Sequence, residues 1–275
     1  MVLEQPTKAR RRKALKTLPS RLYDTYTQVV NRIQGMMWDS SELGMRVLMW
    51  LHLATRPLKI NEIQHALAVE LGNIALDEDN LPTRQRWFGC CLGLVFVDDE
   101  TSTVRFVHYT LEDYFQRYGS SLFPHGHSMA AEICLTYLNF GELSVECSSN
   151  IGMGQLLTIF PFLEYAACTW GYYTAKCRSG VAEALEINVL GSKDKRLPHV
   201  ALQILYFYIN GLGDRLSYGG EQYHGRSLKF LGIHAAAHFG THEINFWKNH
   251  GQRDNQDTPE RTDKTTSKTA RAATT

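Results

Sequence analysis

The spacing of apolar and polar residues changes along residues 39–118 in a fixed order of elements. Three stretches have the 3.6-residue spacing of amphipathic helices: Glu42–Ala54, Glu62–Leu71 and Thr83–Leu92. A short apolar run, Leu58 and Ile60, separates the first two. Two alternating stretches follow, Leu94–Val97 and Val104–Val107, with a polar turn between them. Alternation puts Val104 and Phe106 on one side of the second strand. The order helix, helix, helix, strand, turn, strand predicts a winged helix.

Local signals predict where the helices begin and end. Capping pairs are expected at three helix starts: Asp39 with Glu42, Asn61 with Gln64, and Thr110 with Asp113. Pro82 fits the first helical position, where a missing N–H costs nothing. Arg56-Pro57 ends the first of these helices, because proline disfavours helical geometry in the residue before it. The helix that Thr110 begins carries Leu111, Tyr114, Phe115 and Tyr118, which are expected to close the unit against the strands.

Helical spacing also occurs on both sides of this unit. Before it, a helix capped by Ser20 carries one apolar stripe, formed by Leu22, Tyr26, Val30 and Ile33. After Pro124, helices are predicted at Met129–Phe140, Pro161–Ala175 and Val200–Ile209, the last nearly apolar all round and therefore buried. The aromatic residues of the second are interpreted as core between helices, with a ligand groove as the alternative. Gly141–Ile159 and Gly211–Gly225 are predicted to be loops. The fold class is mainly α: a winged helix with a small β-hairpin, then a helical domain.

Composition narrows the classes of function. The 275 residues carry a net charge of +1, which gives no general attraction to nucleic acid or to an anionic membrane. No apolar run reaches the roughly 18 residues of a membrane span. The N-terminus lacks the apolar core of a secretory signal. The six cysteines have no framework spacing, so reduced thiols and a cytoplasmic location are expected, with nuclear import through the basic run Lys8–Lys16 left open.

Ten short segments together resemble one family of proteins. They are Lys13–Pro19, Tyr23–Ile33, Arg46–Ala54, Arg56–Leu58, Gly93–Val95, Val104–Thr110, Asp113–Phe115, Cys134–Leu138, Phe160–Ala167 and Trp170-Gly171. In this order they resemble fungal NACHT–ankyrin proteins of the NOD-like (STAND NTPase) type, in the region after the nucleotide-binding domain. That region is described as a GPI inositol-deacylase-type winged helix. The resemblance does not bring an esterase site with it, since no catalytic serine motif matches.

A second resemblance begins near Leu228. Leu231–Gly240 is similar to the opening turn and first helix of an ankyrin repeat. There His234 would hydrogen-bond within the turn, Ala236 and Ala237 would allow close helix packing, and Gly240 would end the helix. Residues from Gly251 onward are too polar to bury much surface, so a disordered tail is expected. The resemblance implies an upstream NTPase domain and more repeats, and no phosphate-loop motif G-x-x-x-x-G-K-[ST] occurs in the sequence. We therefore expect a chain truncated at both ends.

The expected organisation follows from both resemblances. Residues 1–19 form a basic remnant or linker, 20–121 the winged helix, 123–218 the helical domain, 228–258 one ankyrin-like repeat, and 259–275 the tail. The resemblance implies a non-enzymatic regulatory module that couples an NTPase domain to ankyrin repeats by intramolecular packing, with protein partners and no cofactor. G-x-S-x-G, H-E-x-x-H and C-x-x-C motifs are absent from the sequence, and no catalytic residue is predicted.

DNA binding is the alternative that a winged helix raises. Its candidate DNA contacts are Arg84 and Arg86, at the start of the third helix. The acidic runs Asp98–Glu100 at the wing tip and Asp77–Asp79 before the helix would repel phosphate, so a protein-packing role is favoured.

Histidines offer two further alternatives. His234, His238 and His242 have a spacing that could hold zinc, but helix continuity fails after Gly240 and no metal site is predicted. His108 is interpreted as structural, and His125 and His127 as loop residues.

Overall fold

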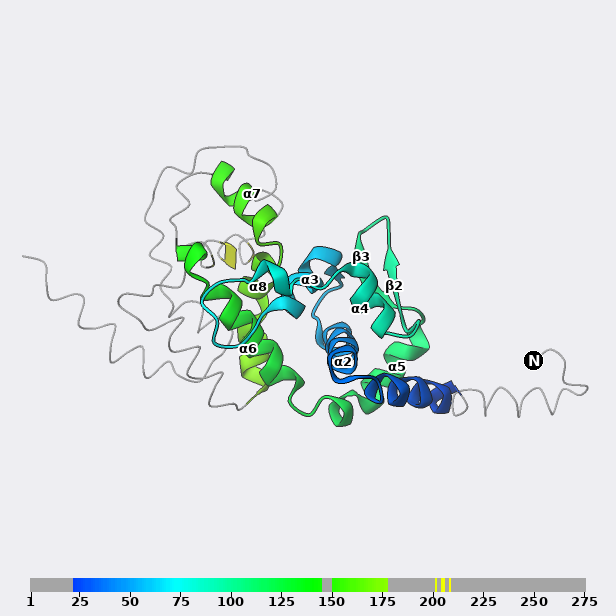
Figure 1. The fold of residues 1–275 in the computed structure, drawn as a ribbon. Helices are drawn as coiled ribbons and strands as arrows, with labels where there is room; N and C mark the ends of the chain where they lie inside the picture. The colour runs from blue at the N-terminus through cyan, green and yellow to red at the C-terminus, as the bar shows by residue number, and fades with distance from the viewer. Residues whose placement is uncertain (1–21, 145–149, 178–200, 202–203, 206–207, 209–275) are drawn as a thin grey trace, which may run out of the picture. The chain divides into compact units, whose positions relative to one another are not determined.

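A three-stranded antiparallel sheet lies at the centre of the winged helix. The computed structural model describes residues 22–144, 150–177, 201, 204, 205 and 208, and Figure 1 shows their arrangement. The strands β1 (Leu58–Lys59), β2 (Val95–Asp98) and β3 (Thr103–Phe106) pair in the order β1-β3-β2. Val95 pairs with Phe106 and Val97 with Val104, so the predicted hairpin is confirmed. The apolar run at Leu58 forms a third strand, because Leu58 pairs with Val104.

Three helices pack on this sheet. They are α2 (Trp38–Leu53), α3 (Ile60–Ala68) and α4 (Arg84–Cys90), with a short 3-10 turn η1 (Glu78–Asn80) before α4. Val47, Leu48 and Trp50 of α2 are fully buried. Gly44 lies where α2 crosses α4, and a Cβ at this position would stand 2.7 Å from the carbonyl oxygen of Cys90. The close crossing is therefore possible only because residue 44 has no side chain.

The first described helix, residues 22–34, lies against α5 (Tyr109–Leu122), as Figure 1 shows. Tyr26 Oη and Thr110 Oγ1 are 2.7 Å apart, and the ring of Tyr23 meets that of Tyr114 edge to face. The predicted stripe of this helix is confirmed at Tyr26, Val30 and Ile33, which are buried. On the other side of α5, Phe115 stacks on Phe106 of the sheet. Tyr118 is 38% exposed, and its ring meets that of Tyr23 of the first described helix edge to face.

The helical region consists of α6 (Gly126–Leu138), η2 (Gly141–Ser144), α7 (Asn150–Ile159) and α8 (Leu163–Lys176). The predicted loop at Gly141–Ile159 is wrong, since it contains η2 and α7. Met153 is buried, and Leu156 and Leu157 pack against the core, which supports a helix there. Ala201, Ile204 and Leu205 are helical and buried as predicted, whereas Tyr208 is 58% exposed.

Every predicted helix cap in the winged helix is wrong in detail. Helix α2 begins one turn before Glu42, with Met37 at its N-cap and no side-chain cap, so Asp39 lies in its first turn. Helix α3 begins at Ile60, and the carboxylate of Glu62 accepts the Lys59 N–H at 2.7 Å in place of the Asn61–Gln64 pair. Thr83 caps α4, which leaves Pro82 outside the helix. Helix α5 begins at Tyr109 because His108 Nδ1 accepts the Thr110 N–H.

The described residues form a mainly helical fold with one small antiparallel sheet, which is the predicted fold class. None of their helices is long and apolar enough to cross a membrane. The basic run Lys8–Lys16, the loop Gly211–Gly225, the ankyrin-like segment 228–258 and the tail 259–275 lie outside the described residues. The predicted domain boundaries therefore stay predictions.

Candidate functional interface

Helix α8 packs its aromatic side chains against the centre of α2. The ring of Trp50, fully buried on α2, meets Phe162, Tyr165 and Tyr173 edge to face at centroid distances of 5.5, 6.2 and 6.1 Å. Such edge-to-face pairs contribute about 0.5–1.5 kcal/mol each beyond the area they bury. The winged helix and the helical region therefore share one continuous core at Trp50.

Two tyrosines of α8 complete the hydrogen bonding at the C-terminal end of α2. Tyr173 Oη donates to the carbonyl oxygen of Leu53 at 3.2 Å, and Tyr165 Oη accepts the Thr55 N–H at 3.2 Å. The two hydroxyls are 2.6 Å apart. Since the Tyr173 proton points to Leu53, the hydrogen bond between the phenols is donated by Tyr165. Backbone groups that a helix end leaves unpaired are thus satisfied by a neighbouring helix.

Burial keeps both phenols neutral. It raises the pKa of Tyr165, against the effect of its hydrogen bond with Tyr173, and it raises the pKa of Tyr173 far above the usual range. Neutral hydroxyls can each donate one hydrogen bond and accept others, which the chain from Thr55 through the two phenols to Leu53 requires.

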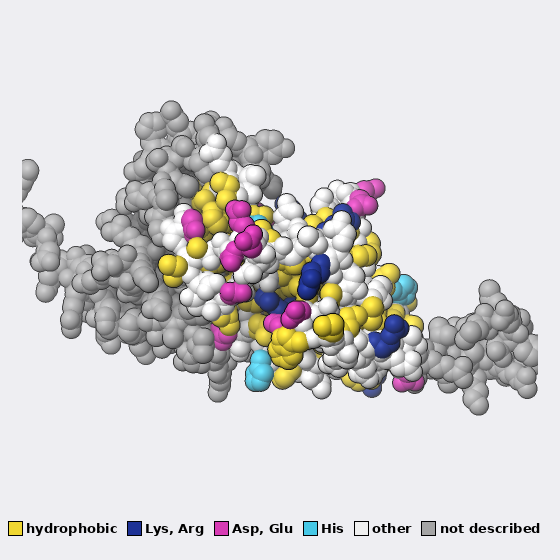
Figure 2. Space-filling model, in the orientation of Figure 1, with side chains coloured by type: hydrophobic (Ala, Val, Ile, Leu, Met, Phe, Trp, Pro, Cys, Tyr) yellow, Lys and Arg dark blue, Asp and Glu magenta, His cyan; other side chains and the backbone are white. Residues whose placement is uncertain are grey.

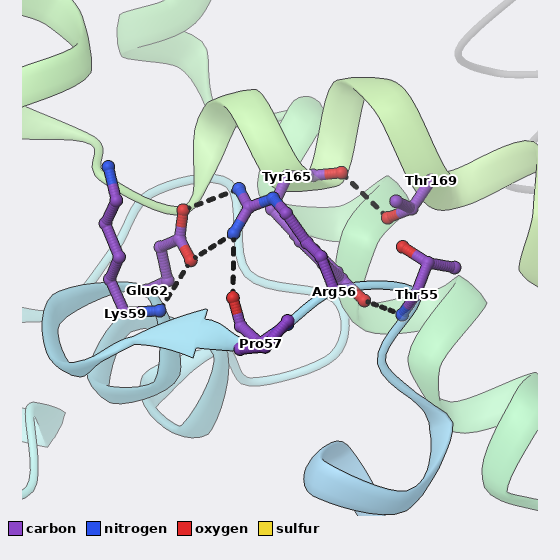
Figure 3. Close-up of polar contacts among 7 residues, drawn as sticks. All are labelled: Thr55, Arg56, Pro57, Lys59, Glu62, Tyr165 and Thr169. Atoms are coloured by element: carbon purple, nitrogen blue, oxygen red, sulfur yellow. Dashed lines mark hydrogen bonds and ion pairs between the residues drawn. The ribbon is translucent and has the colours of Figure 1, made fainter. Parts of the chain in front are cut away.

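An ion pair fixes the segment between α2 and α3 beside this contact (Figure 3). The guanidinium of Arg56 donates two parallel hydrogen bonds to Glu62, Nη1 to Oε2 at 2.8 Å and Nη2 to Oε1 at 2.7 Å. The Glu62 side chain is 3% exposed and that of Arg56 is 39% exposed. Burial opposes the charge of Arg56, but the hydrogen bond and charge of Glu62 outweigh it and raise the Arg56 pKa above its ordinary value. The bidentate geometry makes this one of the stronger kinds of ion pair.

The same arginine contacts α8. Its guanidinium carbon lies 5.0 Å from the ring centroid of Tyr165, within the range of a cation–π interaction. Glu164, next in sequence, adds a second negative charge that raises the Arg56 pKa. Figure 3 shows Arg56 between Glu62 and Tyr165, and also the bond that Thr169 Oγ1 donates to the Tyr165 carbonyl oxygen. Arg56 therefore links the β1–α3 corner of the winged helix to the start of α8.

The chemistry of this interface is that of packing. Its thiols are poor nucleophiles, since burial raises the pKa of Cys168 to about 12 and that of Cys134 further. In the part of the chain that the structure describes, no group of three His, Cys, Asp or Glu residues is placed to hold a metal ion. We call the set Trp50, Thr55, Arg56, Glu62, Tyr165 and Tyr173 the coupling interface.

The candidate DNA contacts Arg84 and Arg86 lie in the first turn of α4 and are exposed. Arg84 faces Asp99 of the wing tip, with 3.6 Å between Nη2 and Oδ1. Both side chains of that pair are largely exposed, so the pair stabilises the fold little. Trp87 and Cys90 of the same helix are buried in the core of the winged helix itself. Whether Arg84 and Arg86 contact DNA stays a prediction.

The wing tip is acidic and ordered by its own carboxylate. Asp98 Oδ1 accepts the N–H groups of Glu100 and Thr101 at 3.1 and 3.4 Å. Hydrogen bonds, the Thr101 hydroxyl first, lower the pKa of Asp98. Figure 2 shows acidic side chains at this tip with a basic side chain beside them. The acidic residues predicted at the wing tip, Asp98–Glu100, therefore lie at the turn between β2 and β3.

The remaining predicted residues are histidines and the residues of the ankyrin-like segment. His108 is structural as predicted, while His127 lies in the first turn of α6 rather than in a loop, with His125 as the N-cap. The ankyrin residues His234, Ala236, Ala237 and Gly240 and the zinc candidates His238 and His242 lie outside the described residues. Arg56 and Glu62 were not recognised as a pair, although an arginine and a carboxylate flanking Pro57 and a short strand are a usable signal.

Comparison with known proteins supports the winged helix. Residues 34–122 match the family model described as "GPI inositol-deacylase, winged helix domain". A curated protein of Monascus ruber, "Azaphilone pigments biosynthesis cluster protein L", is 26% identical over 191 residues, which cover 63% of this chain and 39% of that protein. The chain thus matches less than half the length of this relative. No solved structure matches. Residues 34–122 are therefore similar to a winged helix domain of this type, in agreement with the fold described above.

Proposed function

We propose that this chain is a non-enzymatic regulatory module in which the winged helix and the helical region transmit conformational change through the coupling interface. The observation that carries the proposal is the capping of α2 by Tyr165 and Tyr173 of α8. In a longer protein of the NACHT–ankyrin type, such a module would link an NTPase domain to ankyrin repeats. Its partners are then protein domains, and we expect it in the cytoplasm.

The proposed coupling involves two states, one with α8 packed on α2 and one with α8 moved away from it. If α8 moves away, the Leu53 carbonyl and the Thr55 N–H lose their partners, and Trp50 loses three ring contacts. Each of these hydrogen bonds contributes about 0.5–1.5 kcal/mol net. The position of α8 and the conformation of the α2–α3 corner therefore change together, which is what a coupling element requires.

The surroundings support a protein role over DNA binding. Helix α4, which would enter the major groove, directs Trp87 and Cys90 into the core, and the acidic wing tip repels phosphate. The Monascus ruber relative is longer than this chain, which suits a module that works beside other domains.

Deuterium uptake of the full chain at pH 7.5 tests the transmission. In a Tyr165→Phe/Tyr173→Phe variant, the missing hydroxyls should raise the exchange of Thr55 and also of β1 and α3, by roughly 5- to 30-fold for 1–2 kcal/mol. The control Tyr172→Phe changes a tyrosine of α8 that is 40% exposed and should have no effect. If the change stays within α8, the coupling proposal fails.

A gel shift with duplex DNA across a salt series tests the alternative. A coupling module should leave the duplex unretarded at moderate salt. Retardation that weakens with salt and disappears in an Arg84→Ala/Arg86→Ala variant would establish DNA binding instead.

A further inference from the structure

Three half-buried histidines lie where the winged helix meets the helical region. His52 is on α2, His65 on α3 and His127 on α6. His65 contacts the other side of the boundary, whereas the ring of His52 packs on α5 of the winged helix and that of His127 on α8 of the helical region. Histidine is the side chain whose ordinary pKa lies in the physiological range. Histidines near this boundary could therefore make the packing there depend on pH.

His65 joins α3 to α6. Its Nδ1 is 2.9 Å from Tyr137 Oη, and the two rings meet edge to face at 6.0 Å. Burial lowers the His65 pKa to about 4 and raises that of Tyr137, so at neutral pH both groups are uncharged. Protonation of His65 would place a positive charge between two packed helices.

His52 lies in a space that a glycine leaves open on α5. A Cβ on Gly119 would fall within van der Waals overlap of the His52 imidazole. The rings of Phe115 and Phe123 lie 6.2 Å from it, so α5 presents apolar groups to this ring. The charged group that acts on it comes from α6: burial first, and then the charge of His127, lower the His52 pKa.

His127 faces α8 from the first turn of α6. The rings of Tyr172 and Tyr173 lie 6.2 and 6.1 Å from its ring, and its Nδ1 is buried without a hydrogen-bond partner. Burial and the charge of Lys176 at the end of α8 lower the His127 pKa. The charges that act on His52 and His127 are thus both positive, and they oppose protonation in the packed state.

We propose that the coupling interface is acid-sensitive: below about pH 6, protonation of His65 shifts the equilibrium toward a state in which α6 and α8 have moved away from the winged helix. The regulatory meaning of this opening rests on the proposed coupling function. The opening itself does not, because it requires only that the His65 ring is packed against Tyr137 when closed and hydrated when open.

The sign and size of the effect follow from proton linkage. Burial lowers the pKa of His65 to about 4 in the closed state, and in the open state, where the ring leaves Tyr137, it returns to about 6.5. The closed state is therefore fully stable above pH 6.5 and loses stability as the pH falls below it. A ring that stays neutral when closed shifts the equilibrium about tenfold toward opening between pH 7.5 and 5.5. His65 supplies this factor.

The Thr55 amide reports this opening directly, because its hydrogen bond goes to Tyr165 of α8. Hydrogen exchange of the full chain, corrected for intrinsic rates, is compared at pH 7.5 and 5.5. We expect Thr55 protection to fall at least tenfold in the unmodified protein. His65→Gln should remove about a factor of ten, since glutamine can still bond Tyr137 without titrating. If H65Q does not fold at pH 7.5, His65→Asn, whose side chain also does not titrate, carries the same test. The H52Q/H127Q variant, whose rings each pack within one region, should keep the full loss of Thr55 protection.

His125→Gln is the matched control. His125 is exposed, lies two residues from His127 and makes no cap hydrogen bond, so its variant should behave as the unmodified protein does. An equal loss of Thr55 protection in H65Q, H52Q/H127Q and H125Q would overturn the proposal. So would simultaneous loss of protection throughout β2 and β3, which indicates global unfolding. The phenol variants at pH 7.5 test coupling separately, so either proposal can fail alone.

Discussion

The winged helix and the α6–α8 region are held together in different ways. Elements of the winged helix carry local caps: Thr83 for α4, His108 for α5, Asp98 for the wing and Glu62 for α3. The N-caps of α6 and α8 make no side-chain hydrogen bond. Those helices are held by ring contacts, among them Tyr137 with Phe162 and Trp50 with Tyr173.

This difference indicates which region depends on the other. A local cap stabilises its own element, whereas aromatic contacts require a partner helix in place. Helix α8 uses α2 as that partner, and α2 uses α8 to satisfy its C-terminal end. Changes at the interface should therefore reach both regions, and changes at a winged-helix cap should stay local.

The largest effect is expected for Trp50→Ala. Loss of a fully buried indole that three aromatic rings contact should lower the free energy of unfolding by about 3–5 kcal/mol. Chemical denaturation measures this. Trp38→Ala is the control, because Trp38 lies on the same helix and is 78% exposed. If the two variants were equally stable, Trp50 would not hold the regions together.

A smaller loss is expected for Glu62→Gln. The substitution leaves Arg56 with a neutral partner and weakens the bond to the Lys59 N–H, which should cost about 2–3 kcal/mol. Glu112→Gln, in the first turn of α5 and exposed, should cost less than about 1 kcal/mol. Equal losses in thermal unfolding would contradict the ion-pair account.

The smallest effect is expected for His108→Ala. Its ring caps α5 through Nδ1, and loss of a helix cap costs about 1 kcal/mol. Segment-resolved hydrogen exchange should show the change in the first turn of α5 only. Spread of the change to α8 would mean that local caps also couple the two regions.

The sequence predicted most of the winged helix because its signals are local. The periodicity located α2, α3, α4 and the hairpin, and the alternation of Val104 and Phe106 with Arg105 matches their burial. Cap assignments failed because several side chains could serve: His108, rather than Thr110, accepts the N–H at α5.

The interface could not be predicted in the same way. Tyr165 and Tyr173 were correctly interpreted as core, yet their hydroxyls bond residues 110 and 120 positions away in sequence. Arg56 was interpreted only as a helix end, since nothing in its own neighbourhood indicates a ring from α8. Helix α7 was missed because Met153, Leu156 and Leu157 have their partners elsewhere in the fold.

The central claim is that the two regions form one cooperative unit through the interface. Each has its own buried tryptophan, Trp87 on α4 and Trp170 on α8, among the five in the chain. With 5-fluorotryptophan incorporated in place of tryptophan, fluorine NMR follows the signals of Trp87 and Trp170 in one urea titration, and no other residue needs to be changed. The account predicts that the native signals of Trp87 and Trp170 disappear at the same urea concentration. Loss of the Trp170 signal at a clearly lower concentration, with Trp87 unchanged, would contradict it.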